Sequence, residues 1–466
     1  QRPQHLVVAG EDGLGGDVER RGHPSILTRK LDRGTSGNAS VVAPLLGKRR
    51  ERLPQSGMAS LKIDADPDEV GLDAARLQRV DSYFQRYVDE GRLAGWSVAI
   101  TRRGRVVHYS HAGVTDLDTS TPVTDDVIWR IYSMTKPITS VAAMMLVERG
   151  LIDLNDPIAQ FLPEFAEPRV YVAGPAANPA TVPATEPIRL WHLLTHTAGL
   201  TYGFHHAHAV DEIYRTRGYE FGTPRGVDLA TACQTWASCP LLFQPGSEWN
   251  YSVATDVLGR VVEVVSGKRL DEFFAEEITG PLGMTDTGFV VPEDQRHRLP
   301  KVYTMTAEGL RANASFSATG TVAPTMLSGG GGLVSTAGDY HRFTQMLLRG
   351  GELDGVRLLS PRTVALMTRN HLPGNADLET FGRKLFAESS NVGVGFGLGF
   401  SVVLDPVAGK SLTSAGEFAW GGLASTAFYV DPAEEITAMF FTQFVPSSTY
   451  PIRPRLRTLV MQAVVD

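Results

Sequence analysis

The strongest hydrophobic pattern in the chain lies in residues 138–150, which are apolar on most helical faces and end on Gly150. This pattern predicts a helix buried between two layers, because a surface helix would keep one polar face. Gly150 can adopt the left-handed conformation that ends helices. Pro137 falls in the first turn, where its missing N–H would have had no partner.

Three other segments carry apolar residues at helical spacing. One helix is expected after Gly71, with Asp73 as its N-cap. A second is expected to follow Tyr251 and to end at Gly267, and a third closes the chain near 456–465. The apolar positions that support the first two are Leu77, Val80, Phe84, Tyr87, Val88, Val253, Val257, Leu258, Val261, Val262 and Val265.

Strand-like segments occur both before and after the buried helix at 138–150. Residues 96–101 and 105–110 flank a short turn and predict a β-hairpin, and 424–430 with 436–443 predict a second antiparallel hairpin. A glycine-rich alternation at 393–404 predicts one more strand. A helix, a hairpin and the buried helix in succession indicate an α+β layer that the chain leaves near residue 130.

Two segments lack such periodicity. Residues 1–57 mix Gly, Arg and Pro without a sustained period, and Met58 begins what looks like a natural start. We interpret residues 1–57 as a disordered or non-native leader. The stretch 168–187 is rich in Pro and Ala, and we interpret it as a loop.

Composition narrows the functional classes. The chain has 466 residues, enough for two or three domains, and a formal net charge of −7. That charge argues against a nucleic-acid-binding surface, and no apolar run is long enough for a membrane span. The two cysteines, Cys233 and Cys239, are expected to be free thiols in a reducing compartment. With no signal peptide after Met58, we expect a cytoplasmic protein.

The candidate chemistry begins with Ser133 and Lys136, three residues apart at the start of the buried helix. This spacing puts both side chains on one face of a turn. A serine hydroxyl is a poor nucleophile until a neighbour takes its proton, and a lysine can do so if its amine is kept neutral. Ser-x-x-Lys by itself is a common match, so its weight depends on companions further along the chain.

Other candidate motifs are weaker when each is taken alone. Tyr251, just before a helix, could simply anchor its loop by packing. His205, His206 and His208 invite a metal interpretation, but without a nearby carboxylate we interpret them as a surface cluster. The glycine run at 329–332 is not followed by Gly-Lys-Ser/Thr, so a phosphate-binding loop is rejected.

As a set, the motifs resemble those of the serine β-lactamase-like superfamily and, within it, the family VIII carboxylesterases. The resemblance rests on the order Ser133-x-x-Lys136, then Tyr251-Ser252, then Trp420-Gly421-Gly422 ahead of a strand. It covers nearly everything from about residue 70 to the C-terminus.

The resemblance implies an α+β, β-lactamase-like fold. An antiparallel sheet flanked by helices would be built from both ends of the chain, residues 58–130 and 325–466. A mostly helical domain, residues 131–324, would be inserted between them, with the site in the crevice.

The resemblance also implies catalytic roles. Ser133 would be the acyl-accepting nucleophile, and Tyr251, as a phenolate or through Lys136, would take its proton and later activate water. Because a free tyrosine has a pKa near 10, a base at neutral pH needs positive charge beside it, so Lys136 must lie close. The backbone N–H groups of Ser133 and Leu423 would form an oxyanion hole.

The segment Trp420, Gly421 and Gly422 would contact the substrate, and its small glycines suit a strand edge that approaches a carbonyl group. Penicillin-directed members of the superfamily carry Lys-Thr-Gly here, and usually Tyr-x-Asn where this chain has Tyr251-Ser252-Val253. The missing cation would bind a substrate carboxylate, whereas an aromatic favours neutral, apolar groups. We therefore expect a serine carboxylesterase for short- to medium-chain esters, with weak β-lactam turnover left open.

Several alternatives are open at this point. A β-lactamase or D-amino-acid peptidase is disfavoured by Trp420, and a non-catalytic binding protein by the joint presence of Ser133, Lys136 and Tyr251. An acyltransferase shares the acyl-enzyme, so sequence cannot separate it from a hydrolase. An α/β-hydrolase is rejected because no serine fits the nucleophile elbow, and the near match at Ser97 lies in a predicted strand. We expect no metal or other cofactor and a small-molecule ester as the partner, and leave the oligomeric state open.

Overall fold

An antiparallel sheet is the centre of the structure, a computed structural model that describes residues 61–221, 224, 226–383 and 390–466. The predicted leader, residues 1–57, lies outside these residues. The strands of the sheet are β1 (Gly95–Arg102), β2 (Arg105–Asp116), β3 (Thr121–Pro122), β12 (Val394–Phe396), β13 (Ser401–Val403), β14 (Phe418–Gly421), β15 (Ala427–Asp431) and β16 (Ile436–Thr442).

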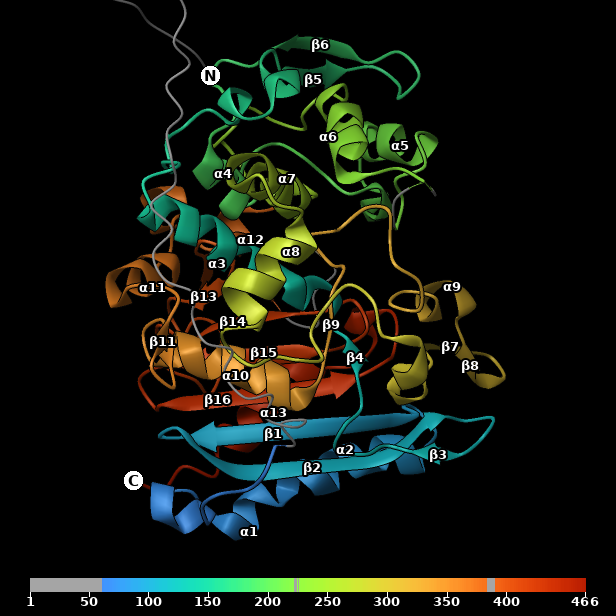
Figure 1. The fold of residues 1–466 in the computed structure, drawn as a ribbon, viewed down its shortest axis with the longest axis vertical. Helices are drawn as coiled ribbons and strands as arrows, with labels where there is room; N and C mark the ends of the chain where they lie inside the picture. Colours follow the sequence, from blue (N-terminus) through green and yellow to red (C-terminus); the bar gives the residue numbers. More distant parts are fainter. Residues whose placement is uncertain (1–60, 222–223, 225, 384–389) are drawn as a thin grey trace, which may run out of the picture. The chain divides into compact units, whose positions relative to one another are not determined.

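The order of the strands joins the two ends of the described chain. Within the described residues the sheet has eight strands in the order β12-β13-β14-β15-β16-β1-β2-β3, and neighbouring strands are antiparallel. Both predicted hairpins are present, and β1 lies beside β16 (Figure 1). The two strands pair along the length of β1, with Val98 opposite Phe440. The implied sheet with strands from both ends is therefore confirmed.

Helices cover both faces of this sheet (Figure 1). One face packs against α1 (Ala74–Leu77), α2 (Arg79–Asp89) and α13 (Ile452–Met461), and Phe84 of α2 lies 4.4 Å from Phe440, centroid to centroid. The other face packs against α3 (Thr135–Glu148) and α10 (Ala337–Leu348), where Tyr340 lies 5.2 Å from Phe428. Both faces are apolar because alternate residues of each buried strand point to opposite sides.

The remaining helices lie mostly beyond α3 or at the rim of the sheet (Figure 1). They are α4 (Leu190–Leu194), α5 (Ala209–Thr216), α6 (Leu229–Ala237), α7 (Ala254–Ser266), α8 (Leu270–Phe274), α9 (Ala314–Ser317), α11 (Pro361–Met367) and α12 (Leu378–Phe381). No helix among the described residues is long and apolar enough to cross a membrane. That residues 131–324 form a separate helical domain stays a prediction.

The central helix is as buried as its sequence predicted. Every residue from Thr135 to Leu146 in α3 is buried, and Gly150 follows the helix with a φ of 67°. Asp73 caps α1 by accepting a hydrogen bond from the backbone N–H of Arg76. Gly267, with a φ of 69°, ends α7. Local periodicity and capping residues thus place these helices correctly.

Two local predictions were wrong. The expected loop at 168–187 contains a ribbon of β5 (Arg169–Ala173) and β6 (Ala180–Pro183). Arg169 and Tyr171 also exchange backbone hydrogen bonds with Leu241, so tertiary contact supports strands that the Pro-rich composition disfavours. The single strand expected at 393–404 is split into β12 and β13, because the chain turns through Gly399 with a φ of 100°.

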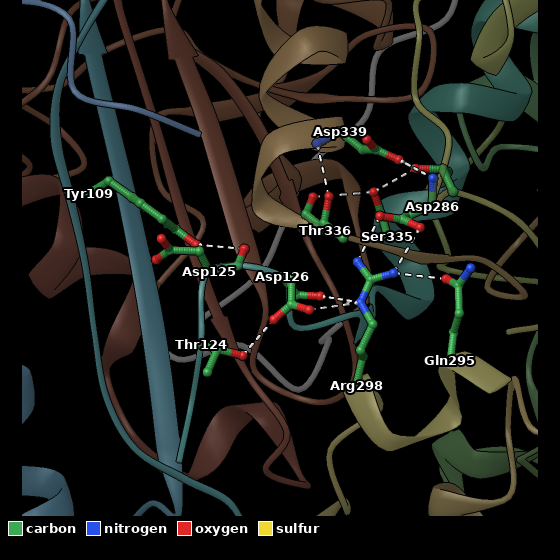
Figure 2. A network of polar contacts seen from close by, with 11 residues as sticks. Tyr109, Thr124, Asp125, Asp126, Asp286, Gln295, Arg298, Ser335, Thr336 and Asp339 are labelled. Atoms are coloured by element: carbon green, nitrogen blue, oxygen red, sulfur yellow. Dashed lines mark hydrogen bonds and ion pairs between the residues drawn. The ribbon is translucent and has the colours of Figure 1, made fainter. Parts of the chain in front are cut away.

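Three smaller ribbons complete the described strands: β4 (Trp129–Arg130) with β9 (Val334–Ser335), β7 (Tyr303–Thr306) with β8 (Gly309–Ala312), and β10 (Glu352–Leu353) with β11 (Val356–Arg357). A polar network joins the segment 286–298 to the chain before β4 and to the start of α10 (Figure 2). Arg298 pairs with Asp286 at 2.7 Å and donates to the backbone carbonyl of Asp126 at 2.8 Å. Asp339 accepts from the backbone N–H of Asp286 at 2.8 Å.

Candidate active site

Ser133 lies in the short connection between β4 and α3. It occupies a 3₁₀ turn, Tyr132–Met134, that runs directly into the helix. Tyr132 has a φ of 43°, a left-handed conformation that is costly for a residue with a side chain. This sharp turn after β4 leaves the half-buried Ser133 on the wall of a cavity of about 1090 Å³.

Lys136 is almost completely buried, with 2 % of its surface exposed. Its ammonium group donates to the carbonyl of Gly330 at 2.7 Å, to the hydroxyl of Tyr202 at 3.1 Å and to Oγ of Ser133 at 3.3 Å. Three acceptors therefore match its three N–H donors. A buried cation held in this way can bias nearby oxygens toward their negative form.

Tyr251 contacts the same serine oxygen from the other side. Its hydroxyl donates to Oγ of Ser133 at 2.6 Å, and the ammonium nitrogen of Lys136 lies 4.5 Å from the centre of its ring. The structure thus brings Ser133, Lys136 and Tyr251 together, although the tyrosine lies 118 positions from the serine in the chain. A hydroxyl between a phenol and an ammonium is an arrangement suited to nucleophilic catalysis.

Two histidines hold Tyr251 in place. Nε2 of His205 donates to the backbone carbonyl of Tyr251 at 2.7 Å. The ring of His196 packs against the tyrosine ring at 5.0 Å, while its Nδ1 lies 3.2 Å from Oγ of Ser252. Burial lowers the pKa of His196 well below its usual value, and the Lys136 charge adds to the effect. His196 is therefore a neutral packing partner at physiological pH.

Lys136 is connected to a buried carboxylate through Gly330, an arrangement that the sequence motifs did not reveal. The carbonyl of Gly330 accepts from Lys136, and the N–H of the same residue donates to Asp256 of α7 at 3.0 Å. Asp256 also accepts from Ser328 at 2.5 Å, so it holds the glycine-rich loop at two points. Burial raises the pKa of Asp256, and the positive charge of Lys136 opposes this shift.

Tyr202, Asp256 and His205 are the polar residues that motif analysis missed or misread. Tyr202 carried no signal in the sequence beyond being an aromatic residue between the predicted buried helix and Tyr251. Asp256 lies five residues after Tyr251, hence on the first turns of the helix that follows it, and this spacing was the one available clue.

The predicted surface cluster of histidines is only partly on the surface. His205 contacts Tyr251, His206 pairs with Glu220 at 2.9 Å, and His208 caps α5 by accepting from the N–H of Val210. Their partners differ, so the three rings do not converge. No group of three His, Cys, Asp or Glu residues suited to a metal occurs in the described part of the chain.

The Trp-Gly-Gly segment borders the same cavity. Trp420 and Gly421 lie within β14 itself, whereas the motif was expected only ahead of a strand. The Trp420 ring packs 5.4 Å from Tyr251 and 5.3 Å from Phe396, centroid to centroid. An aromatic thus occupies the wall beside Tyr251, where a lysine would have placed a charge.

Gly421 ends β14, and Gly422 and Leu423 follow it in a turn. A Cβ atom on Gly422 would clash with the carbonyl of Ile131, so only glycine lets this turn approach the chain next to Ser133. A Cβ on Gly421 would clash with the guanidinium of Arg453. Ser133, Gly422 and Leu423 all line the cavity. Among the backbone hydrogen bonds of the described loops and turns, none uses the N–H of Leu423.

The two cysteines are free, as predicted, and both are buried. Ser97 lies within β1, also as predicted, and it is buried, so it is no nucleophile elbow.

Comparison with known proteins identifies relatives of this chain. Esterase EstB of Burkholderia gladioli is 32% identical over 397 residues, which cover 81% of this chain and 93% of EstB. Protein Rv1367c of Mycobacterium tuberculosis is 37% identical, over 77% of this chain and 88% of that protein. The solved structure of EstCE1, described as a hydrolase with promiscuous acyltransferase activity, matches with a TM-score of 0.70 and 29% identity, over 83% of this chain and 98% of EstCE1. The family description Beta-lactamase matches residues 80–462, and the chain therefore belongs to the β-lactamase family.

Proposed function

We propose that the protein is a serine carboxylesterase that hydrolyses small-molecule esters through an acyl-enzyme on Ser133. The observation that carries the proposal is the 2.6 Å hydrogen bond between Tyr251 and Oγ of Ser133, with Lys136 beside the same oxygen. Esterase EstB and EstCE1, which is described as a hydrolase, support the reaction class. The proposal includes a cytoplasmic location, which two free thiols suit.

In the first half-reaction, Tyr251 acts after it has lost its proton, a state that the positive charge of Lys136 stabilises. Oγ of Ser133 attacks the ester carbonyl carbon and its proton passes to the Tyr251 oxygen. The carbonyl π electrons move onto oxygen, where the N–H groups of Ser133 and Leu423 stabilise the charge. As the tetrahedral intermediate collapses, the bond to the alcohol oxygen breaks and Tyr251 returns the proton to it.

The second half-reaction repeats these steps with water. Tyr251, again unprotonated, takes a proton from a water molecule that attacks the acyl carbon. The bond between that carbon and Oγ of Ser133 then breaks, and the proton passes back to the serine oxygen. Carboxylic acid leaves, and the enzyme is restored.

The aromatic wall of the cavity indicates that the substrate is uncharged at this place. Trp420 lies against Tyr251. The sequence resemblance implies that penicillin-directed proteins carry a lysine at this place. A neutral acyl or alcohol group is favoured there, because an aromatic offers a carboxylate no ionic partner.

Hydrolysis of p-nitrophenyl butyrate by wild type and Ser133→Ala tests the proposal. We expect the variant to lose activity by a factor on the order of 10⁴ or more, because it lacks the oxygen that forms the acyl-enzyme. Intact mass after a brief reaction should show one added butyryl group on wild type and none on the variant. Equal turnover by both proteins would refute Ser133 as the nucleophile, provided that their thermal unfolding curves coincide.

Acyl transfer is a second candidate, since the EstCE1 structure is described as that of a hydrolase with promiscuous acyltransferase activity. An alcohol can replace water in the second half-reaction without any other change. Product analysis in the presence of a competing alcohol measures the ratio of new ester to free acid. Free acid as the main product at low alcohol concentration supports hydrolysis as the primary reaction.

A further inference from the structure

Six aromatic rings form an arc that begins and ends beside Ser133. Successive ring centres from Tyr251 to Tyr202, Phe204 and Phe221 lie 5.3, 4.7 and 5.6 Å apart. From Phe221 the arc passes to Phe316 at 5.9 Å and then to Tyr132 at 6.3 Å, the residue before Ser133. All of these except Phe316 line the cavity that contains Ser133.

The outer part of this arc is not explained by stability. Phe221 is 58 % exposed, yet its ring is stacked on Phe204 with an interplanar angle of 7°. A large exposed aromatic contributes little to folding, because much of its surface stays in water. An apolar ring that borders the cavity and remains open to solvent is instead suited to a ligand.

The size of the cavity agrees with a large ligand. Its volume of about 1090 Å³ is slightly above the roughly 300–1,000 Å³ typical of sites for drug-sized molecules. A linear ester with a few carbons on each side would leave most of the aromatic arc uncovered.

The position of Tyr251 indicates which half of the ester lies along the arc. In the proposed reaction Tyr251 returns a proton to the leaving oxygen, so the alcohol half must start within hydrogen-bond reach of its hydroxyl. The arc starts at the ring of this same residue, through Tyr202 at 5.3 Å. Resting on the proposed esterase function, we propose that the preferred substrates are esters of alcohols that carry a planar, fused-ring apolar group, which extends the stack formed by Phe204 and Phe221.

The test compares butyrate esters of three primary alcohols: ethanol, cyclohexylmethanol and 2-naphthylmethanol. Their leaving groups have similar reactivity, so differences in kcat/KM report how the alcohol half is bound. We expect the naphthylmethyl ester to exceed the cyclohexylmethyl ester by about tenfold, because stacking adds to simple apolar burial. Ethyl 3-(2-naphthyl)propanoate, which carries the ring in the acyl half, should gain less over ethyl butyrate.

Variants at Phe221 separate stacking from apolar burial. Phe221→Ala should lower the ratio of naphthylmethyl to ethyl ester turnover by about three- to tenfold. Phe221→Leu should recover only the part of this ratio that comes from apolar burial and not the part that comes from stacking. The matched control is Leu412→Ala, which removes an equally exposed apolar side chain that does not line the cavity. It should leave the ratio unchanged, and thermal unfolding should coincide for all three variants.

Failure of this inference is distinguishable from failure of the esterase proposal. Hydrolysis of ethyl butyrate without preference for the naphthylmethyl ester, or a larger gain when the ring is in the acyl half, would overturn the inference alone. If no ester is hydrolysed, the esterase proposal fails. Binding of 2-naphthylmethanol, measured by quenching of protein fluorescence, then tests whether the aromatic arc is a ligand site. Binding that weakens in Phe221→Ala supports an aromatic-ring site, whereas no binding overturns it.

Discussion

At the scale of single residues, two tyrosines reach the Ser133–Lys136 pair but have different roles. Tyr202 accepts a hydrogen bond from Lys136, whereas Tyr251 donates directly to Ser133. Burial raises the pKa of Tyr202 well above its usual value, and the charges of Asp256 and Tyr251 add to the effect. Tyr202 therefore keeps its proton at neutral pH and accepts a hydrogen bond from Lys136, and in the proposed mechanism Tyr251 is the group that exchanges a proton with Ser133.

The same substitution at both tyrosines tests this division. Tyr251→Phe should lower kcat by a factor on the order of 10² to 10⁴, as expected for loss of a general acid–base group. Tyr202→Phe should cost only about tenfold, because it removes one hydrogen bond to a charged group. Steady-state kinetics with p-nitrophenyl butyrate measures both, and equal losses would contradict the assignment.

At the scale of elements, the start of α10 depends on a buried carboxylate. Thr336 caps the helix, while Asp339 in its first turn accepts from the N–H of Asp286 and from Oγ1 of Thr287 at 2.9 Å (Figure 2). Burial raises the pKa of Asp339 to about 6 in spite of these hydrogen bonds. The ionised form of Asp339 is thus less stable in the folded protein than in the unfolded chain.

This raised pKa predicts a specific pH dependence of stability. Between pH 3.8 and about 6 the folded state binds this proton more tightly, so the contribution of Asp339 to stability is full below pH 3.8 and is lost as pH rises through 6. Asp339→Asn cannot ionise and retains an acceptor oxygen. Its free energy of unfolding relative to wild type should therefore rise by about 3 kcal/mol across this range. Urea denaturation at several pH values measures the difference, and a pH-independent difference would contradict the prediction.

At the scale of the whole molecule, the last helix is tied to the strand that borders the site. Arg457 of α13 donates from Nε at 2.8 Å to Glu417, which is 0 % exposed and immediately precedes β14. Arg453 of the same helix donates to the carbonyl of Gly422 at 3.1 Å. The C-terminal helix thus supports both β14 and the turn that carries Leu423.

Removal of Arg457 tests how much its ion pair with Glu417 contributes to the free energy of unfolding. Arg457→Ala should lower the free energy of unfolding by about 3–5 kcal/mol, because it leaves the Glu417 carboxylate buried without its cation. Arg455→Ala, in the same helix but exposed, should change it by less than about 0.5 kcal/mol. Chemical denaturation of both variants provides the comparison, and similar small effects would show that the pair contributes little.

The sequence alone determined the elements whose evidence is local. The buried helix α3, the two hairpins, the caps at Asp73 and Gly267, and the Ser-x-x-Lys turn could be predicted because periodicity and capping depend on neighbours a few residues away. The order of the motifs was enough to predict the family and to identify Ser133, Lys136 and Tyr251 as candidate site residues.

Only the tertiary structure decided which distant groups meet. The β5–β6 ribbon is supported by Leu241, and the contacts of Tyr202, His205 and Asp256 join segments that no local pattern connects. Burial, which sets the pKa of Tyr202 and Asp339, likewise depends on what the whole chain packs around each group. Local periodicity reports which face of an element is buried, whereas the partners on that face are chosen by packing across the entire fold.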